Sequence, residues 1–82
     1  MAVVELMTRK GCHLCDEVKA TLLSVRRDHP FDLRELDIDE DPALLSRYDH
    51  EVPVVLVDGH KLAKYRLDAA VLVRRLDQGK MT

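Results

Sequence analysis

Two short, almost continuous apolar segments place the strongest constraint on how this chain can fold. The segments are Val3–Met7 and Val54–Val57. A strand that is open to water on one side alternates apolar and polar residues, whereas a strand buried on both faces is apolar along its whole length. Glu5 alone interrupts the first segment. We therefore expect both segments to be central strands of one sheet.

One helix and one strand are predicted directly after the first segment. Apolar residues between Leu14 and Val25 recur at helical intervals and form a single stripe. Pro30 prevents this helix from continuing, because proline lacks a backbone donor. Residues 31–39 then alternate acidic and apolar side chains, which is typical of an edge strand.

The second half of the chain predicts a short helix and a hairpin. Residues 41–48 form the helix, with Asp41 as its N-cap. Asp58 and Gly59 are a residue pair that joins antiparallel strands in a two-residue turn. Residues 60–65 therefore return as the partner of the second apolar strand.

A last helix completes one α/β domain. Asp68 can cap this helix, and Gly79 is expected to end it. The order βαβαββα then gives a four-stranded mixed sheet, in which the first two strands are parallel and the last two antiparallel. At 82 residues the chain has room for one core. We expect one domain over residues 1–78 and a frayed tail over residues 79–82.

Charge and hydropathy exclude several classes of partner. The chain has thirteen Lys and Arg and fifteen Asp and Glu, and the positive and negative residues are interspersed along the sequence. Neither nucleic acid nor an acidic membrane is therefore expected as a partner. No apolar run approaches the roughly 20 residues of a membrane-spanning helix. The amino end lacks the basic start and long apolar core of a signal peptide. We expect a soluble, cytoplasmic protein.

The two cysteines, Cys12 and Cys15, are separated by two residues. Cys12 follows a central strand and precedes a helix, where unpaired N–H groups and a partial positive charge stabilise a thiolate. We expect it to titrate below the ~8.5 of a free cysteine. His13 adds a further cation when it is protonated. Cys15 lies on the apolar stripe and is expected to be more buried and less ionised.

That asymmetry assigns a role to each thiol. Cys12 is expected to attack a substrate disulfide as the nucleophile, and Cys15 to resolve the mixed disulfide that results. One alternative is that both residues are merely small core side chains. Another is a metal site in which the two thiolates and His13 are ligands, although a closed zinc site needs four ligands and the other histidines are isolated. We expect no metal within the chain.

Three motifs in this order resemble the short glutaredoxin-like proteins, which have the thioredoxin fold. The motifs are "GCHLC" after the first strand, "VPVVLVDG" about forty residues later, and "RLD" at the start of the last helix. The resemblance implies that Pro53 is cis and packs against the cysteines. It also implies that the backbone of Val52 faces the site, where a peptide or glutathione could pair with it as an added strand.

The chain departs from the typical glutaredoxin pattern at several positions around this site. His13 and Leu14 stand where proline and an aromatic residue are usual, and Glu51 stands in place of threonine. Lys64 and Tyr65 replace a Gly-Gly pair whose bare backbone lets glutathione approach. We therefore expect weak glutathione binding.

The sequence thus predicts a monomeric, glutaredoxin-like thiol–disulfide oxidoreductase without a bound cofactor. Its substrate is expected to be a disulfide-containing protein or a small-molecule thiol substrate, and its electron donor a reductase or glutathione as co-substrate. Arg9 and Asp68 match positions that hold the charged ends of glutathione in the family. The predicted substrate-binding residues are Arg9, His13, Val52, Pro53 and Asp68. The alternatives from other classes are a metal or iron–sulfur module, with Cys12 ligating a cluster at a dimer interface, and a simple binding domain.

Overall fold

Strands and helices follow one another in the predicted order. The computed structural model describes residues 1–80. Its elements are β1 (Val3–Thr8), α1 (His13–Asp28), β2 (Asp32–Asp37), the 3₁₀ turn η1 (Ile38–Glu40), α2 (Pro42–Tyr48), β3 (Val54–Val57), β4 (His60–Lys64) and α3 (Ala69–Lys80). Of the helices in this part of the chain, none combines the length and apolar character that crossing a membrane requires.

The four strands form one mixed sheet in the order β2-β1-β3-β4. β1 pairs with β2 in parallel, whereas the pairs β1 with β3 and β3 with β4 are antiparallel. The predictions of a mixed sheet, of β1 and β3 as its central strands and of β2 as an edge strand are confirmed.

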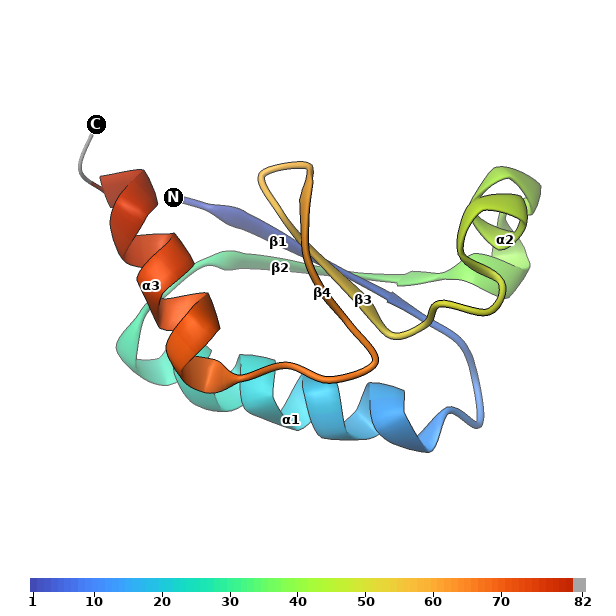
Figure 1. Ribbon diagram of the computed structural model, residues 1–82, viewed down its shortest axis with the longest axis horizontal. Coiled ribbons are helices and arrows are strands. Elements are labelled where there is room, and N and C mark those ends of the chain that lie inside the picture. Colours follow the sequence, from blue (N-terminus) through green and yellow to red (C-terminus); the bar gives the residue numbers. More distant parts are fainter. Residues whose placement is uncertain (81–82) are drawn as a thin grey trace.

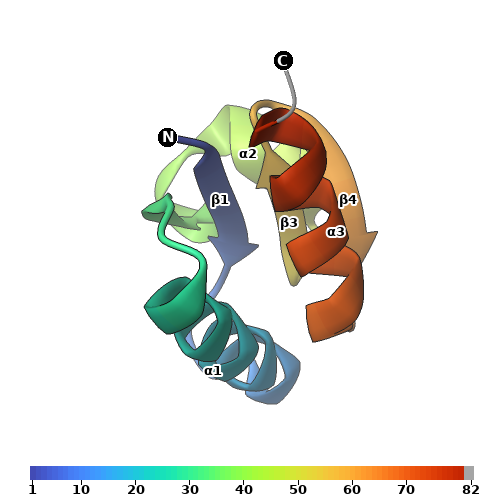
Figure 2. The ribbon, with the colours of Figure 1, turned by 90° about the vertical axis from the view of Figure 1, so that its left-hand side faces the viewer.

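Helices cover both faces of this sheet (Figure 1). α1 runs along one face of the sheet. α2 lies past the ends of the strands, on the side of the molecule opposite the start of β1. Seen from the side, α3 lies in front of β3 and β4, close to α1 (Figure 2). One apolar cluster joins α1 and α3 to the sheet, and a second joins α2 and η1 to its other face.

The two-sided burial explains the continuous apolar run of β3. Val55 and Val57 belong to the cluster beneath α1 and α3, whereas Val54 and Leu56 belong to the cluster beneath α2. All four side chains are buried. Glu5 of β1 is only partly buried, because α2 lies toward the opposite end of that strand (Figure 1).

The hairpin between β3 and β4 has the predicted two-residue turn. Asp58 and Gly59 have φ angles of 50° and 84°, which are both in the left-handed region required by a type I′ turn. The Asp58 carboxylate accepts a hydrogen bond of 3.0 Å from the N–H of Val3. The turn is thereby fixed to the start of β1.

Asp68 caps α3 as predicted, but α3 does not end at Gly79. The Asp68 carboxylate accepts a 2.8 Å hydrogen bond from the N–H of Ala70. The helix continues through Gly79 to Lys80, so the prediction that this glycine ends it is wrong. Glycine ends a helix by taking a left-handed conformation, and inside a helix it costs only about 1 kcal/mol relative to alanine. The expected tail over residues 79–82 therefore begins within α3, and residues 81–82 lie outside the described residues.

Two adjacent leucines of α1 provide a test of this packing. Leu22 is fully buried, whereas Leu23 is 43% exposed. We expect Leu22→Ala to lower the free energy of unfolding by about 2–5 kcal/mol, because it leaves a cavity in the core. Leu23→Ala should change it by less than about 0.5 kcal/mol. Urea unfolding of both variants measures this, and equal effects would contradict the assigned helix face.

Candidate redox site

Cys12 and Cys15 lie at the junction of β1 and α1 and are joined by a disulfide. Their Cα atoms are 5.2 Å apart, which lies within the usual range for a disulfide. The pair therefore occupies the carboxyl end of a central strand and the amino end of a helix, as predicted.

Cys12 is the N-cap of α1. Its backbone is extended, and its Sγ accepts a hydrogen bond of 3.1 Å from the N–H of Cys15. A side chain that accepts from an N–H of the first turn satisfies a group without an intrahelical partner. The same donor is in place to stabilise a negative charge on this sulfur once the disulfide is reduced.

The two sulfurs differ in exposure as the sequence predicts. Cys15 is only 2% exposed and lies on the buried side of α1 with Val18 and Leu22. Cys12 is only partly buried. A molecule that approaches from solvent can therefore reach Cys12 before Cys15.

Gly11 makes the turn that brings Cys12 to the cap position. Its φ is 75°, which glycine adopts freely and other residues rarely do. A Cβ placed on Gly11 would have no heavy atom within 4 Å. The requirement for glycine here comes from the backbone conformation and not from crowding.

His13 points into solvent beside the dithiol. Its side chain is 88% exposed, and its Nε2 lies 3.9 Å from Oε1 of Glu17. The neighbouring Leu14 is also exposed. A contact of His13 with substrate stays a prediction.

The Val52-Pro53 peptide bond is cis, as the resemblance implies. Pro53 is fully buried, and its carbonyl accepts a 2.8 Å hydrogen bond from the N–H of Tyr65. Val52 is partly buried against the α2 cluster. The pairing of Val52 with a substrate backbone stays a prediction.

Lys64 and Tyr65, which stand in place of the glycine pair, are held against the segment that precedes Pro53. The Tyr65 hydroxyl donates a 2.9 Å hydrogen bond to the carbonyl of His50, and Lys64 Nζ lies 3.3 Å from Glu51 Oε1. Tyr65 also has a φ of 69°, which is uncommon for a bulky side chain. Tyr65 lines a recess of about 340 Å³ between α1 and the segment that leads to α3.

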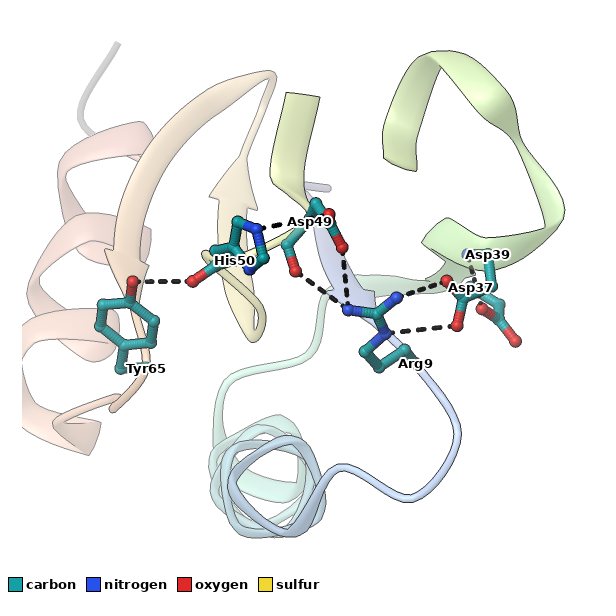
Figure 3. A network of polar contacts seen from close by, with 6 residues as sticks. All are labelled: Arg9, Asp37, Asp39, Asp49, His50 and Tyr65. Carbon is teal, nitrogen blue, oxygen red and sulfur yellow. Dashed lines mark hydrogen bonds and ion pairs between the residues drawn. The ribbon is translucent and has the colours of Figure 1, made fainter. Parts of the chain in front are cut away.

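Arg9 is bound within the protein (Figure 3). Its guanidinium forms a fork with Asp39, where Nη2 to Oδ1 is 2.6 Å and Nε to Oδ2 is 3.2 Å. Nη1 donates to the carbonyl and to Oδ1 of Asp49, at 3.0 and 3.1 Å. Sequence reasoning missed both aspartates, because they follow Arg9 by 30 and 40 residues. Glutathione binding by Arg9 and by Asp68 stays a prediction.

These contacts shift the titration of the groups involved. Hydrogen bonds to Asp39, and then to Asp49, raise the pKa of Arg9. The hydrogen bond from Arg9 lowers the pKa of Asp39. The hydrogen bond from Lys64, followed by the charge of Lys61, lowers the pKa of Glu51.

The described residues give no support to a metal site within the chain. Over residues 1–80, no three side chains of His, Cys, Asp or Glu come together in an arrangement that could hold a metal ion. The site that this part of the chain does present is a pair of cysteines at a helix terminus. The packing of the cis Pro53 against these cysteines stays a prediction.

Comparisons with known proteins place the chain in a family. The model of the Glutaredoxin-like domain (DUF836) matches residues 3–77, so the chain belongs to this family. The uncharacterized protein Rv0508 of Mycobacterium tuberculosis is 33% identical over 70 residues, which cover 79% of this chain and 72% of the relative. The resemblance inferred from the three motifs is confirmed.

Solved structures agree on the fold. The solution structure of protein Ne2328 from Nitrosomonas europaea has a TM-score of 0.79 at 30% identity, over 90% of this chain and 89% of that one. A mutant thioredoxin from Halobacterium salinarum has a TM-score of 0.71 at 20% identity, over 94% of this chain and 73% of that one. The fold is thioredoxin-like, and together with the Cys12–Cys15 disulfide it suggests a redox function.

The lowered pKa of Asp39 predicts acid-dependent stability. A carboxyl group that titrates lower in the folded than in the unfolded state stabilises the fold above its ordinary value, here 3.8, and ceases to do so as the pH falls through its folded pKa. Asp39→Asn should therefore lower the urea midpoint at about pH 7, and the difference from the natural protein should shrink as the pH falls below 3.8. The matched control is Asp32→Asn, in the exposed pair with Arg34 at 3.6 Å. If the difference in urea midpoint between Asp39→Asn and the natural protein did not change with pH, the result would contradict the pairing of Asp39 with Arg9.

Proposed function

We propose that this protein is a thiol–disulfide oxidoreductase in which Cys12 is the nucleophile and Cys15 the resolving thiol. The observation that carries the proposal is the cap geometry, in which Cys12 Sγ accepts the N–H of Cys15 at 3.1 Å while Cys15 itself is buried. A thiolate is the reactive species in disulfide exchange. Membership of the glutaredoxin-like family supports the same chemistry.

The reaction proceeds in two exchanges. The Cys12 thiolate attacks one sulfur of the substrate disulfide, forms a mixed disulfide and releases the other sulfur as a thiolate. Cys15 then loses its proton and attacks Cys12 Sγ, which releases the second substrate thiolate and closes the Cys12–Cys15 disulfide. Two electrons pass from the protein dithiol to the substrate. The released thiolates take up protons, one of them from Cys15 and the other from solvent.

Substrate docking is assigned to the groups around Cys12. The backbone of Val52, next to the cis Pro53, pairs with an extended substrate segment in the manner of an added strand. The exposed imidazole of His13 contacts the substrate from the start of α1. The substrate is a disulfide-containing protein or a small-molecule disulfide, and the protein acts as a cytoplasmic monomer without a bound cofactor.

The electron donor is a reductase or a thioredoxin-like protein in preference to glutathione. Lys64 and Tyr65 place two long side chains where a glycine pair would leave the backbone accessible. The Tyr65 hydroxyl is also hydrogen-bonded to the carbonyl of His50. Glutathione must therefore approach over an ordered aromatic ring. Arg9 and Asp68, the expected partners of its charged ends, already have partners within the chain.

Alkylation of the reduced protein tests the assignment of the two thiols. We expect iodoacetamide to label Cys12 at least about tenfold faster than Cys15 at about pH 6, because Cys12 is more exposed and its sulfur accepts an N–H at the amino end of α1. Mass spectrometry of digested samples taken over time measures both rates. Equal rates would contradict the assignment.

Serine variants separate the two roles. Cys12→Ser should abolish the reduction of insulin disulfides, whereas Cys15→Ser should accumulate a mixed disulfide on Cys12. If Cys12→Ser kept its activity, Cys12 would not be the nucleophile. If the natural protein reduced no disulfide, the proposed function itself would be wrong.

The reduction of the oxidised protein by millimolar glutathione tests the choice of donor. We expect the natural protein to react slowly and the double variant Lys64→Gly, Tyr65→Gly to react about tenfold faster, which corresponds to ~1.4 kcal/mol. Tyr65→Phe is the matched control, since it removes the hydrogen bond to His50 but keeps the ring. It should stay slow. A natural protein that is already fast, with no gain from the glycines, would restore glutathione as the donor.

A further inference from the structure

Arg9 connects two segments that flank the dithiol. It lies in the loop between β1 and Cys12, and its guanidinium contacts Asp39 in η1 and Asp49 at the end of α2. Three nitrogens make four hydrogen bonds, and the fork on Asp39 fixes the plane of the guanidinium. The loop that carries the nucleophile is thereby attached to a distant part of the chain.

The bond to Asp49 reaches the main chain and not only a carboxylate. Asp49 is the C-cap of α2, and its carbonyl accepts from Arg9 Nη1 at 3.0 Å. Carbonyls at the end of a helix have no intrahelical donor, so this contact satisfies a group that otherwise needs one. Asp49 is four residues before Pro53 in the chain. Arg9 therefore holds the backbone from which the cis-proline segment begins.

Tyr65 holds the same segment from the opposite side (Figure 3). Its hydroxyl donates to the carbonyl of His50 at 2.9 Å, and its N–H donates to the carbonyl of Pro53 at 2.8 Å. Residues 49–53 are thus fixed between the loop that precedes Cys12 and the segment that leads to α3.

The charges around Arg9 oppose a role in binding a substrate carboxylate. Asp39 and Asp49 lie within 3.1 Å of the guanidinium, and Asp37 lies next to them, with its carboxylate accepting the N–H of Asp39 at 2.9 Å. An incoming carboxylate would have to displace one aspartate and would be repelled by the others. His50, whose Nε2 is 3.5 Å from Asp49 Oδ2, offsets this charge only when it is protonated.

We propose that Arg9 is a positioning residue that holds the segment 49–53 against the Cys12 loop, and that it is not a ligand for a substrate anion. This inference rests on the proposed disulfide exchange for its effect on activity, whereas its structural part stands independently. Removing Arg9 should impair the docking of a protein substrate and leave the intrinsic reactivity of Cys12 unchanged.

The test compares Arg9→Gln with Arg34→Gln, which breaks an exposed Arg–Asp pair of β2 at 3.6 Å. We expect Arg9→Gln to lower kcat/KM for insulin reduction about tenfold, mainly through KM. The rate of Cys12 alkylation by iodoacetamide should stay within about twofold, because that reagent needs no docking surface. Arg34→Gln should change neither rate. Arg9→Lys should recover only part of the loss, since lysine cannot form the fork.

Two small disulfides separate positioning from anion binding. Under our proposal Arg9→Gln changes the reduction of neutral bis(2-hydroxyethyl) disulfide and of anionic 3,3′-dithiodipropionate by the same small factor. A selective loss with the anionic compound would show that Arg9 binds substrate carboxylates and would overturn the proposal. Full insulin activity in Arg9→Gln would overturn it as well.

Amide hydrogen exchange tests the structural part without relying on activity. The N–H of Glu51 donates to the carbonyl of Tyr48 at 2.9 Å, and its exchange should accelerate in Arg9→Gln but not in Arg34→Gln. Unchanged exchange would overturn the proposal even if the protein is active. If the natural protein reduces no disulfide, the proposed function fails while this measurement still decides the role of Arg9. Should Arg9→Gln not fold, Arg9→Lys is measured in its place.

Discussion

The amino end of α1 has backbone N–H groups that the helix itself cannot satisfy, and the rest of the site depends on how they are used. The hydrogen bond of 3.1 Å from Cys15 N–H to Cys12 Sγ gives one of these groups a sulfur acceptor. An oxygen cap such as serine or aspartate would stabilise the helix at least as well. A sulfur in this position belongs both to the helix cap and to the Cys12–Cys15 disulfide, so the start of the helix and the disulfide cannot be separated.

The sheet brings the three segments of the site to one end of the molecule. β1 and β3 are antiparallel neighbours, so the end of β1, which leads to Cys12, lies beside the start of β3, which follows Pro53. β4 then returns antiparallel to β3 and brings Tyr65 to the same end. The Asp58-Gly59 turn fixes how β4 pairs with β3, because the register of a hairpin follows from its turn and loop length. The pairing of the strands therefore also sets the positions of the segments of the site.

The sequence predicts the elements and the dithiol because these depend on local patterns. The stripe of α1, the Asp58-Gly59 turn and the Asp68 cap are each contained within a few residues. The contacts of Arg9 are not, since Asp39 and Asp49 are ordinary surface aspartates until the fold places them around the guanidinium. The cis bond before Pro53 followed from the family resemblance alone. The tyrosine side chain at position 65 gives no indication that its backbone is left-handed. The continuation of α3 past Gly79 shows how weakly one glycine determines where a helix ends.

The start of β1 and the end of α3 lie at the edge of the molecule opposite the turn that carries the dithiol (Figure 1). Attachment through either end would therefore orient the Cys12–Cys15 disulfide away from the point of attachment. A surface or a resin coupled there would leave the disulfide facing the solution, and a second protein joined there would not cover it. Under the proposed disulfide exchange, this geometry suits the protein to capture experiments, in which an immobilised Cys15→Ser variant would retain substrates as mixed disulfides.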